Sequence, residues 1–165
     1  VKGVTEGELP RFAEWARKAG HIVRFIEYMP LDADKAWERD KVLTAEEILA
    51  GLSAAGELVL TRGHPSDPAV RYRYKDGRGE VGVIASVTRP FCQACNRIRL
   101  TADGMVRTCL FAAAEHDLKV LLRRGAPDDG IKTWLAGVVR TKTPGHLIGQ
   151  EEFAPPDRTM SAIGG

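Results

Sequence analysis

The three cysteines of this 165-residue chain are clustered, and no other feature constrains its folding as strongly. Two residues separate Cys92 from Cys95, and Cys109 follows after a hairpin signal at Asp103-Gly104. An odd number of cysteines cannot all pair in internal disulfides. A hairpin between Cys95 and Cys109 folds its second strand beside its first and brings the third sulfur toward the other two. The spacing therefore favours a metal site over a disulfide framework.

Three thiolates without an evident fourth ligand leave the kind of metal site open. A structural zinc site has four closed ligands and a 4Fe–4S cluster usually has four cysteines, whereas an open coordination position is typical of a catalytic metal. His116 is the nearest histidine after Cys109, but it falls at the start of a predicted helix. On spacing alone, a zinc site with three cysteines and a distant histidine, or three buried cysteines without a ligand, remain alternatives.

Basic side chains surround the cysteines in the sequence. Arg97 and Arg99 have the same parity on a predicted strand, so both project from one face. Guanidinium groups bind anions and hydrogen-bond acceptors with bidentate geometry, which makes this pair a candidate ligand site. The pair equally fits a role in offsetting the negative charge of the thiolates. Arg89 precedes the cysteines and Arg107 lies close to Cys109.

The composition excludes several classes of protein. With 24 Lys+Arg against 22 Asp+Glu the formal net charge is +2, which does not support a nucleic-acid partner. The apolar runs are much shorter than the roughly 20 residues of a membrane-spanning helix, and no signal-peptide pattern is present. We therefore expect a cytoplasmic protein with no membrane partner. The chain begins with Val1 instead of Met, which we interpret as the loss of an N-terminal part of a longer parent.

Hydrophobic spacing in residues 1–55 predicts an α/β segment. The patterns Thr5–Glu8 and Thr44–Glu47 are those of capping boxes and predict helices that end near Gly20 and Gly56. An apolar run over 21–29 predicts a strand between the two helices. A helix, a glycine and then a strand are typical of a βα unit in a parallel sheet.

Residues 56–165 have the pattern of a smaller antiparallel α+β unit. Strands are predicted over 58–61, 70–75 and 81–87, and the hairpin arms over 97–100 and 105–107. Helices are predicted over 115–124 and 128–140. The basic and aromatic residues 71–75 are interpreted as a strand with alternating faces, in preference to a site for single-stranded nucleic acid.

The sequence contains three separated motifs: RFIEYMP at 24–30, FCQACNRIRLTADG at 91–104 with CLF at 109–111, and RTMSAIGG at 158–165. Together they resemble the motifs of the GTP 3′,8-cyclase family of molybdenum cofactor biosynthesis. They occur in the family's order and cover essentially the whole chain. The family consists of radical S-adenosylmethionine lyases that convert GTP to 3′,8-cyclo-7,8-dihydro-GTP. The resemblance implies an α/β fold: the last βα part of a partial TIM barrel, then a small α+β iron–sulfur domain with antiparallel strands.

The resemblance also implies roles for individual residues. It implies that Cys92, Cys95 and Cys109 hold a 4Fe–4S cluster with one iron open to the substrate. Arg24 and Met29 have opposite parity, so both reach one site only if the chain bends after Ile26 or Glu27. The implied GTP-binding residues are Arg24, Arg97, Ile98 and Arg99, the S-adenosylmethionine-binding residue is Met29, and the catalytic tail residues are Gly164 and Gly165.

One family motif is missing from the sequence. The family's other cluster needs a Cys-x3-Cys-x2-Cys motif, for which this chain has no cysteines left, and a complete barrel takes roughly 200–250 residues. We therefore expect the C-terminal half of the enzyme, with S-adenosylmethionine and the second 4Fe–4S cluster bound only in the full-length protein and no activity of this half alone. The alternative is a zinc-stabilised module that binds RNA or protein without catalysis.

The resemblance implies several partners. These are GTP, the missing N-terminal half, a second copy of the full-length chain in a homodimer, and the cyclic pyranopterin monophosphate synthase that receives the product.

Overall fold

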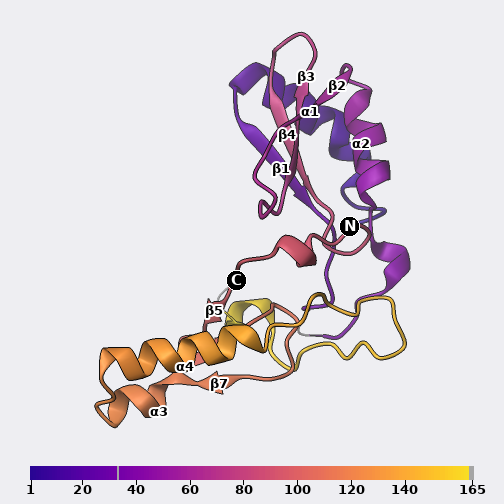
Figure 1. The fold of residues 1–165 in the computed structure, drawn as a ribbon. Helices are drawn as coiled ribbons and strands as arrows, with labels where there is room; N and C mark the ends of the chain where they lie inside the picture. The colour runs from indigo at the N-terminus through magenta and orange to yellow at the C-terminus, as the bar shows by residue number, and fades with distance from the viewer. Residues whose placement is uncertain (33, 164–165) are drawn as a thin grey trace. The chain divides into compact units, whose positions relative to one another are not determined.

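The computed structural model describes residues 1–32 and 34–163, which form two compact units (Figure 1). The first unit consists of Val1–Met29 and Trp37–Cys95. The second consists of Pro30–Ala36 and the chain from Asn96 onward. The segment after the first strand therefore belongs to the second unit, and the chain then returns to complete the first.

The first unit contains a mixed four-stranded sheet with the order β1-β4-β3-β2. Strand β1 (Ile22–Ile26) is parallel to β4 (Glu80–Ile84). Strand β3 (Val70–Tyr74) is antiparallel to β4 and to β2 (Leu58–Thr61). The predicted mixture of helices with antiparallel strands is confirmed, and the parallel pairing is limited in this sheet to β1 with β4.

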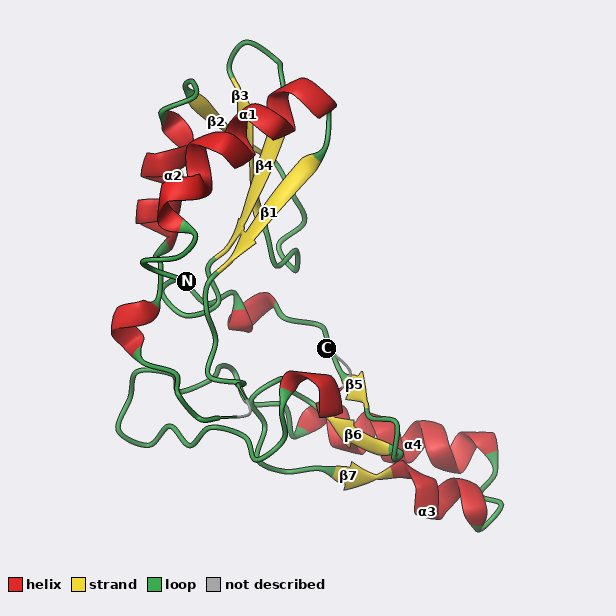
Figure 2. Cartoon of the chain, turned by 180° about the vertical axis from the view of Figure 1, so that it is seen from behind, coloured by secondary structure: helices red, strands yellow, loops and turns green. Residues whose placement is uncertain are grey.

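Two helices cover one face of this sheet, as both ribbon views show (Figures 1 and 2). Helix α1 (Leu9–Ala19) and helix α2 (Ala45–Ser53) contribute their buried apolar side chains to a core shared with the strands. Val81 is completely buried, and Tyr74 is 1% exposed with its hydroxyl donating to the Leu52 carbonyl at 3.1 Å. The apolar core of the unit therefore lies on the helical side of the sheet.

The opposite face of the sheet carries charged side chains. Arg24 of β1 and Arg71 of β3 are both in register with Gly82 of β4, which lies between them. A Cβ atom at Gly82 would lie 3.2 Å from Cγ of Arg24, so the glycine leaves room for that side chain. Glu80 of β4 accepts hydrogen bonds from Arg71 Nε at 2.8 Å and from Arg73 at 3.4 Å.

Only one of the two predicted capping boxes forms. The Glu47 amide donates to Thr44 Oγ1 at 3.3 Å and the Thr44 amide donates to Glu47 Oε2 at 2.9 Å, as predicted. At Thr5 the prediction is wrong, because α1 begins only at Leu9, after a 3-10 turn. Thr44 has the extended backbone that a capping residue requires, with ψ 157°, whereas Thr5 has ψ −18° and is already helical.

The second unit contains a three-stranded antiparallel sheet in the order β5-β6-β7. The predicted hairpin is confirmed: β5 (Arg99–Leu100) pairs with β6 (Met105–Arg107), with Arg99 opposite Arg107. Helix α4 (Asp128–Arg140) has the predicted bounds. In the part of the chain that the structure describes, no helix is long and apolar enough to cross a bilayer.

The helix predicted over 115–124 begins later than expected. Helix α3 spans Leu118–Arg123, and the two preceding residues form β7 (His116–Asp117). His116 pairs with Val106 in the sheet, and the Asp117 side chain caps α3 by accepting from the Val120 amide at 3.0 Å. The strand forms because β6 offers a free edge, a partner that local hydrophobic spacing does not reveal.

The predicted boundary after residue 55 lies between α2 and β2, which belong to the same unit. The assignment of residues 1–55 to a partial barrel stays a prediction.

Candidate cluster and nucleotide site

Cys92 and Cys95 lie on one tight turn of the first unit. A 3-10 turn spans Cys92–Ala94, and the Cys95 amide donates to the Cys92 carbonyl at 3.1 Å. Both cysteines are free thiols and half-buried. Two candidate sulfur ligands therefore come from a single local element, which is the geometry that the Cys-x-x-Cys spacing predicts.

Cys109 follows strand β6 in the second unit and is also a free, half-buried thiol. The last paired residues of the hairpin are Arg99 and Arg107. Arg97 and Cys109 each lie two residues beyond this last pair, past the ends of β5 and β6. The implied nucleotide-binding segment, with Ile98 at its centre and 46% exposed, and the third cysteine therefore follow the same end of the hairpin.

The three cysteines as one ligand set stay a prediction. Cys92 and Cys95 belong to the first unit and Cys109 to the second. Over residues 1–32 and 34–163, no three His, Cys, Asp or Glu side chains form a group that could hold a metal ion. The donor chemistry nevertheless fits an iron–sulfur cluster, because all three side chains are free thiols and thiolates are its usual ligands.

Arg24 and Met29, which the resemblance implies as binding residues for GTP and S-adenosylmethionine, both lie in the first unit. Arg24 is exposed on the open face of β1. The strand ends at Ile26, and Met29 follows it half-buried in an irregular segment. In a continuous strand, Arg24 and Met29 would point to opposite faces. Because the strand ends at Ile26, this alternation of faces does not extend to Met29. Gly164 and Gly165 lie outside the described residues.

Glu27 is a buried residue that the sequence reasoning missed. Its side chain is 1% exposed and accepts hydrogen bonds from the backbone amides of Ala45 at 2.8 Å, Val87 at 2.7 Å and Thr88 at 2.8 Å. The Thr88 hydroxyl donates to it as well. One carboxylate thus joins the end of β1, the first residue of α2 and the segment that leads to Cys92. The one sequence signal for this role was the position of an acidic residue, Glu27, inside the apolar run over 21–29.

A network of charges fastens the C-terminal segment to the hairpin. Arg158 donates to both carboxylate oxygens of Asp103, at 3.2 and 2.8 Å, and to Glu115 at 2.9 Å. Glu115 also pairs with Arg107, which is 2% exposed. Ile163 is completely buried five positions after Arg158. The chain that precedes the double glycine is therefore held at two points.

This network predicts a pH dependence of stability. The Arg158 hydrogen bond, with a second one from Thr101, lowers the pKa of Asp103 below its ordinary value of 3.8. The ionised Asp103 therefore stabilises the fold above pH 3.8, and the contribution is lost as the pH falls below that value. We expect Asp103→Asn to be less stable than the wild type at pH 7, with the difference shrinking progressively as the pH falls below about 4.

The measurement is denaturant unfolding across this pH range. Asp157→Asn is the matched control, because Asp157 is exposed and adjacent to Arg158. A wild-type advantage over Asp103→Asn that stays constant down to pH 2 would contradict the assignment.

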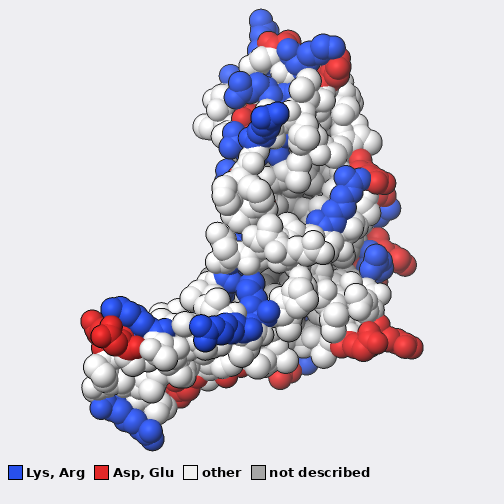
Figure 3. All heavy atoms as spheres, viewed as in Figure 1, with Lys and Arg blue, Asp and Glu red and all other residues white. Residues whose placement is uncertain are grey.

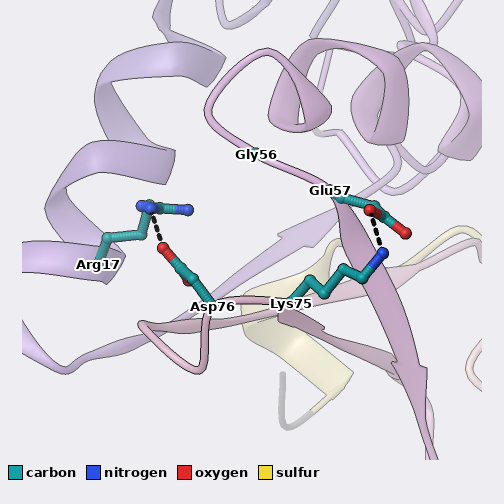
Figure 4. A pocket seen from close by; sticks show the side chains of 5 residues that line it. All are labelled: Arg17, Gly56, Glu57, Lys75 and Asp76. Atoms are coloured by element: carbon teal, nitrogen blue, oxygen red, sulfur yellow. Dashed lines mark hydrogen bonds and ion pairs between the residues drawn. The ribbon is translucent and has the colours of Figure 1, made fainter.

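The hollow shown in Figure 4 is a poor candidate for a ligand site. It measures about 340 Å³ and lies beside the turn between β3 and β4. Arg17 pairs with Asp76 at 2.5 Å, and Lys75 pairs with Glu57 at 2.7 Å. Because its charged groups neutralise one another, the hollow offers no excess charge to an ionic ligand. It also lies at the other end of β4 from the segment that leads to the cysteines.

The distribution of charge agrees with the near-neutral composition. On the face drawn in Figure 3, most of the surface is uncharged, and the basic side chains form small separate groups, several of which have acidic side chains beside them. This mixture differs from the continuous basic stripe typical of nucleic-acid-binding proteins.

Comparison with known proteins identifies the family. Residues 21–148 match the family described as Molybdenum Cofactor Synthesis C, which covers most of the chain, including the hairpin and all three cysteines. The chain therefore belongs to the molybdenum cofactor synthesis C family.

Relatives in this family carry the name GTP 3′,8-cyclase. The chain is 47% identical over 167 residues to the GTP 3′,8-cyclase of Streptomyces coelicolor, covering 100% of this chain and 49% of that protein. It is 47% identical over 153 residues to that of Rhodococcus opacus (92% and 44% covered) and 43% over 169 residues to that of Rhodopirellula baltica (100% and 47%). The chain spans about half the length of these curated relatives and corresponds to their C-terminal part.

Proposed function

We propose that this chain is the cluster-bearing and GTP-binding part of a GTP 3′,8-cyclase, a lyase that forms 3′,8-cyclo-7,8-dihydro-GTP in molybdenum cofactor biosynthesis. The observation that supports this function most directly is the hairpin, in which the Arg99–Arg107 pair lies two residues from both Arg97 and Cys109. The same chain is similar over its whole length to proteins named for that reaction. Neither a zinc-stabilised RNA-binding nor a protein-binding module accounts for both observations.

In this proposal Cys92, Cys95 and Cys109 are the protein ligands of a 4Fe–4S cluster. Bound by three thiolates, such a cluster supplies one iron that is open to a nitrogen or oxygen of the purine. The paired thiols on one turn and the third at the end of the hairpin are the groups that this chain contributes. Each is free of disulfide bonds and partly accessible, as a ligand must be.

The arginines of the hairpin bind and orient the nucleotide in this proposal. Arg99 lies in β5 and Arg97 two residues before it, a spacing that directs both guanidinium groups to one side if the chain stays extended, where they can donate to oxygens of GTP in pairs. Ile98 contributes an exposed apolar contact between them. Arg24, on the open face of the first sheet, is assigned to the triphosphate, and Met29 to S-adenosylmethionine. The chain thereby contributes positioning, which brings reacting atoms together before reaction.

The C-terminal tail is assigned to the reaction site. Gly164 and Gly165 have no side chains, so they can enter a narrow space. The Arg158 network and the buried Ile163 hold the residues in front of them against the second unit. We propose that this anchoring allows the last two residues to reach substrate while the rest of the tail stays fixed.

The remaining components come from outside this chain. We propose that the N-terminal half supplies S-adenosylmethionine binding and the second 4Fe–4S cluster, and that this half alone is inactive. A homodimer of full-length chains, a cytoplasmic location and transfer of the product to the cyclic pyranopterin monophosphate synthase complete the proposal.

The test of this function is metal and sulfide analysis after anaerobic reconstitution with iron and sulfide. We expect about four irons and a similar amount of labile sulfide per chain, with the visible absorption of a cluster. Cys109→Ser should lose most of this iron, whereas Ser66→Ala, a substitution in the loop between β2 and β3 of the first unit, should not. One tightly bound zinc without sulfide would contradict the proposal and support the binding module instead.

A further inference from the structure

Lys142 lies at the open end of the β5–β6 hairpin, beyond the last paired residues of its two strands. It follows the end of α4 and is half-buried. Its ammonium group donates to the Arg97 carbonyl at 3.0 Å and also to the Thr108 carbonyl. These two acceptors belong to opposite arms, and each is on or next to a residue of the proposed site. A single side chain therefore connects the strand that carries Arg97 to the strand that carries Cys109.

The chemistry of lysine suits this position. The cross-strand ladder ends at Arg99 and Arg107, so the arms continue beyond it. Two carbonyl oxygens that approach the same point carry like partial charges and both need donors. An ammonium group has three donors and no acceptor, so it can satisfy both oxygens at once. Bonds from a charged donor are also stronger than those between neutral groups.

The chain that follows Lys142 packs on the same arm. The ring of His146 lies 5.1 Å from the ring of Phe111, and the ring of Phe153 lies 6.1 Å from it. Phe111 comes just after Cys109 in the sequence. The segment after α4 is therefore seated on the cysteine-bearing arm, which keeps Lys142 between the arms.

We propose that Lys142 is a positioning residue that sets the distance between Arg97 and Cys109. It acts through the two backbone carbonyls and touches neither the nucleotide nor the metal. The inference rests on the proposed function for what the two arms bind, but the link between the arms can be tested without either ligand.

Lys119 provides a matched control in the same hairpin. It donates to the Asp103 carbonyl at 3.1 Å, at the closed end of the hairpin. There the turn is already fixed by the Gly104 amide, which donates to the Thr101 carbonyl at 3.0 Å. Lys119→Met thus removes a lysine-to-carbonyl bond and one charge without opening the arms.

The first measurement is amide hydrogen exchange of the metal-free chain. We expect Lys142→Met to accelerate exchange across residues 97–109 by about tenfold relative to the wild type and Lys119→Met, with strands β1–β4 unchanged. Lys142→Arg, whose guanidinium can also donate to two oxygens, should restore most of the protection. Unchanged exchange over 97–109 in Lys142→Met overturns the inference.

The second measurement separates positioning from simple stability. In the iron-loaded chain, we expect Lys142→Met to raise the GTP concentration for a half-maximal change of the cluster spectrum by about tenfold, and Lys119→Met to leave it unchanged. Faster exchange in Lys142→Met with unaltered GTP dependence would reduce Lys142 to a structural role and overturn the inference. If GTP leaves even the wild-type spectrum unchanged, the proposed function fails, and the exchange result alone decides whether Lys142 links the arms.

Discussion

Replacing Glu27 with alanine is expected to lower the free energy of unfolding of the first unit by about 3–5 kcal/mol. The substitution leaves three backbone amides and the Thr88 hydroxyl without their shared acceptor. Two of these groups are buried, and a buried donor without a partner costs the full loss of its hydration. The same carboxylate also lies at the N-terminus of α2, where a negative charge is favourable.

Denaturant unfolding followed by circular dichroism measures this effect. Glu27→Gln should fall between the wild type and Glu27→Ala, because its amide keeps one acceptor oxygen. Glu14→Ala is the control: Glu14 is an exposed residue of α1 that forms an ion pair with Lys18, and its loss should change stability by less than about 0.5 kcal/mol. A Glu27→Ala protein as stable as this control would show that the hydrogen bonds to Glu27 do not hold the segment before Cys92.

The second large effect is expected at Arg107. Its buried guanidinium pairs with Glu115 and donates to the carbonyls of Ala112 and, at 3.5 Å, Leu110. The turn that follows Cys109 is therefore folded around this group. Arg107→Met removes these bonds while keeping an apolar stem of similar length, and should lower the free energy of unfolding of the second unit by about 2–4 kcal/mol.

Two readouts test the effect of Arg107→Met. Thermal unfolding reports the loss of stability, and the rate of modification of the Cys109 thiol reports whether its turn has loosened. Arg62→Met, an exposed substitution after β2, should change neither. Lysine at position 107 keeps the charge but not the planar fork, so Arg107→Lys should recover only part of the stability. Unaltered reactivity of the Cys109 thiol in Arg107→Met would show that the hydrogen bonds of Arg107 do not hold the turn after Cys109.

The elements that were predicted from the sequence are those with local causes. Gly20 ends α1 with φ 70°, a conformation that favours glycine, and the Thr44 box begins α2. The Asp103-Gly104 turn produces the β5–β6 hairpin, with Gly104 at φ 84°. Each depends on residues a few positions apart, so a short window of sequence contains the whole cause.

The missed features depend on partners far away in the chain. A parallel sheet was expected for β1, but its partner β4, nearly sixty residues away, was not predicted. Strand β7 replaces part of a predicted helix because β6 is there to pair with it. Glu27 and Lys142 were not identified because most groups that bond to Glu27, and both acceptors of Lys142, belong to the backbone, which leaves no signature of residue type.

The candidate site was predictable to a similar extent. The Cys-x-x-Cys turn, and the hairpin with Arg97 and Cys109 at its open end, follow from spacing and turn chemistry. The side chains that fix this hairpin come from α4 and the C-terminal segment, and only the folded chain shows where they lie.

Electron paramagnetic resonance of the reconstituted, reduced chain, recorded with and without GTP, shows whether nucleotide reaches the cluster. We expect a cluster signal that changes on addition of GTP, and that keeps its GTP-free form when Arg97 and Arg99 are both replaced by alanine. A signal that GTP leaves unaltered in the wild-type chain, at concentrations well above those in cells, would contradict the claim that the hairpin arginines hold the nucleotide at an open iron.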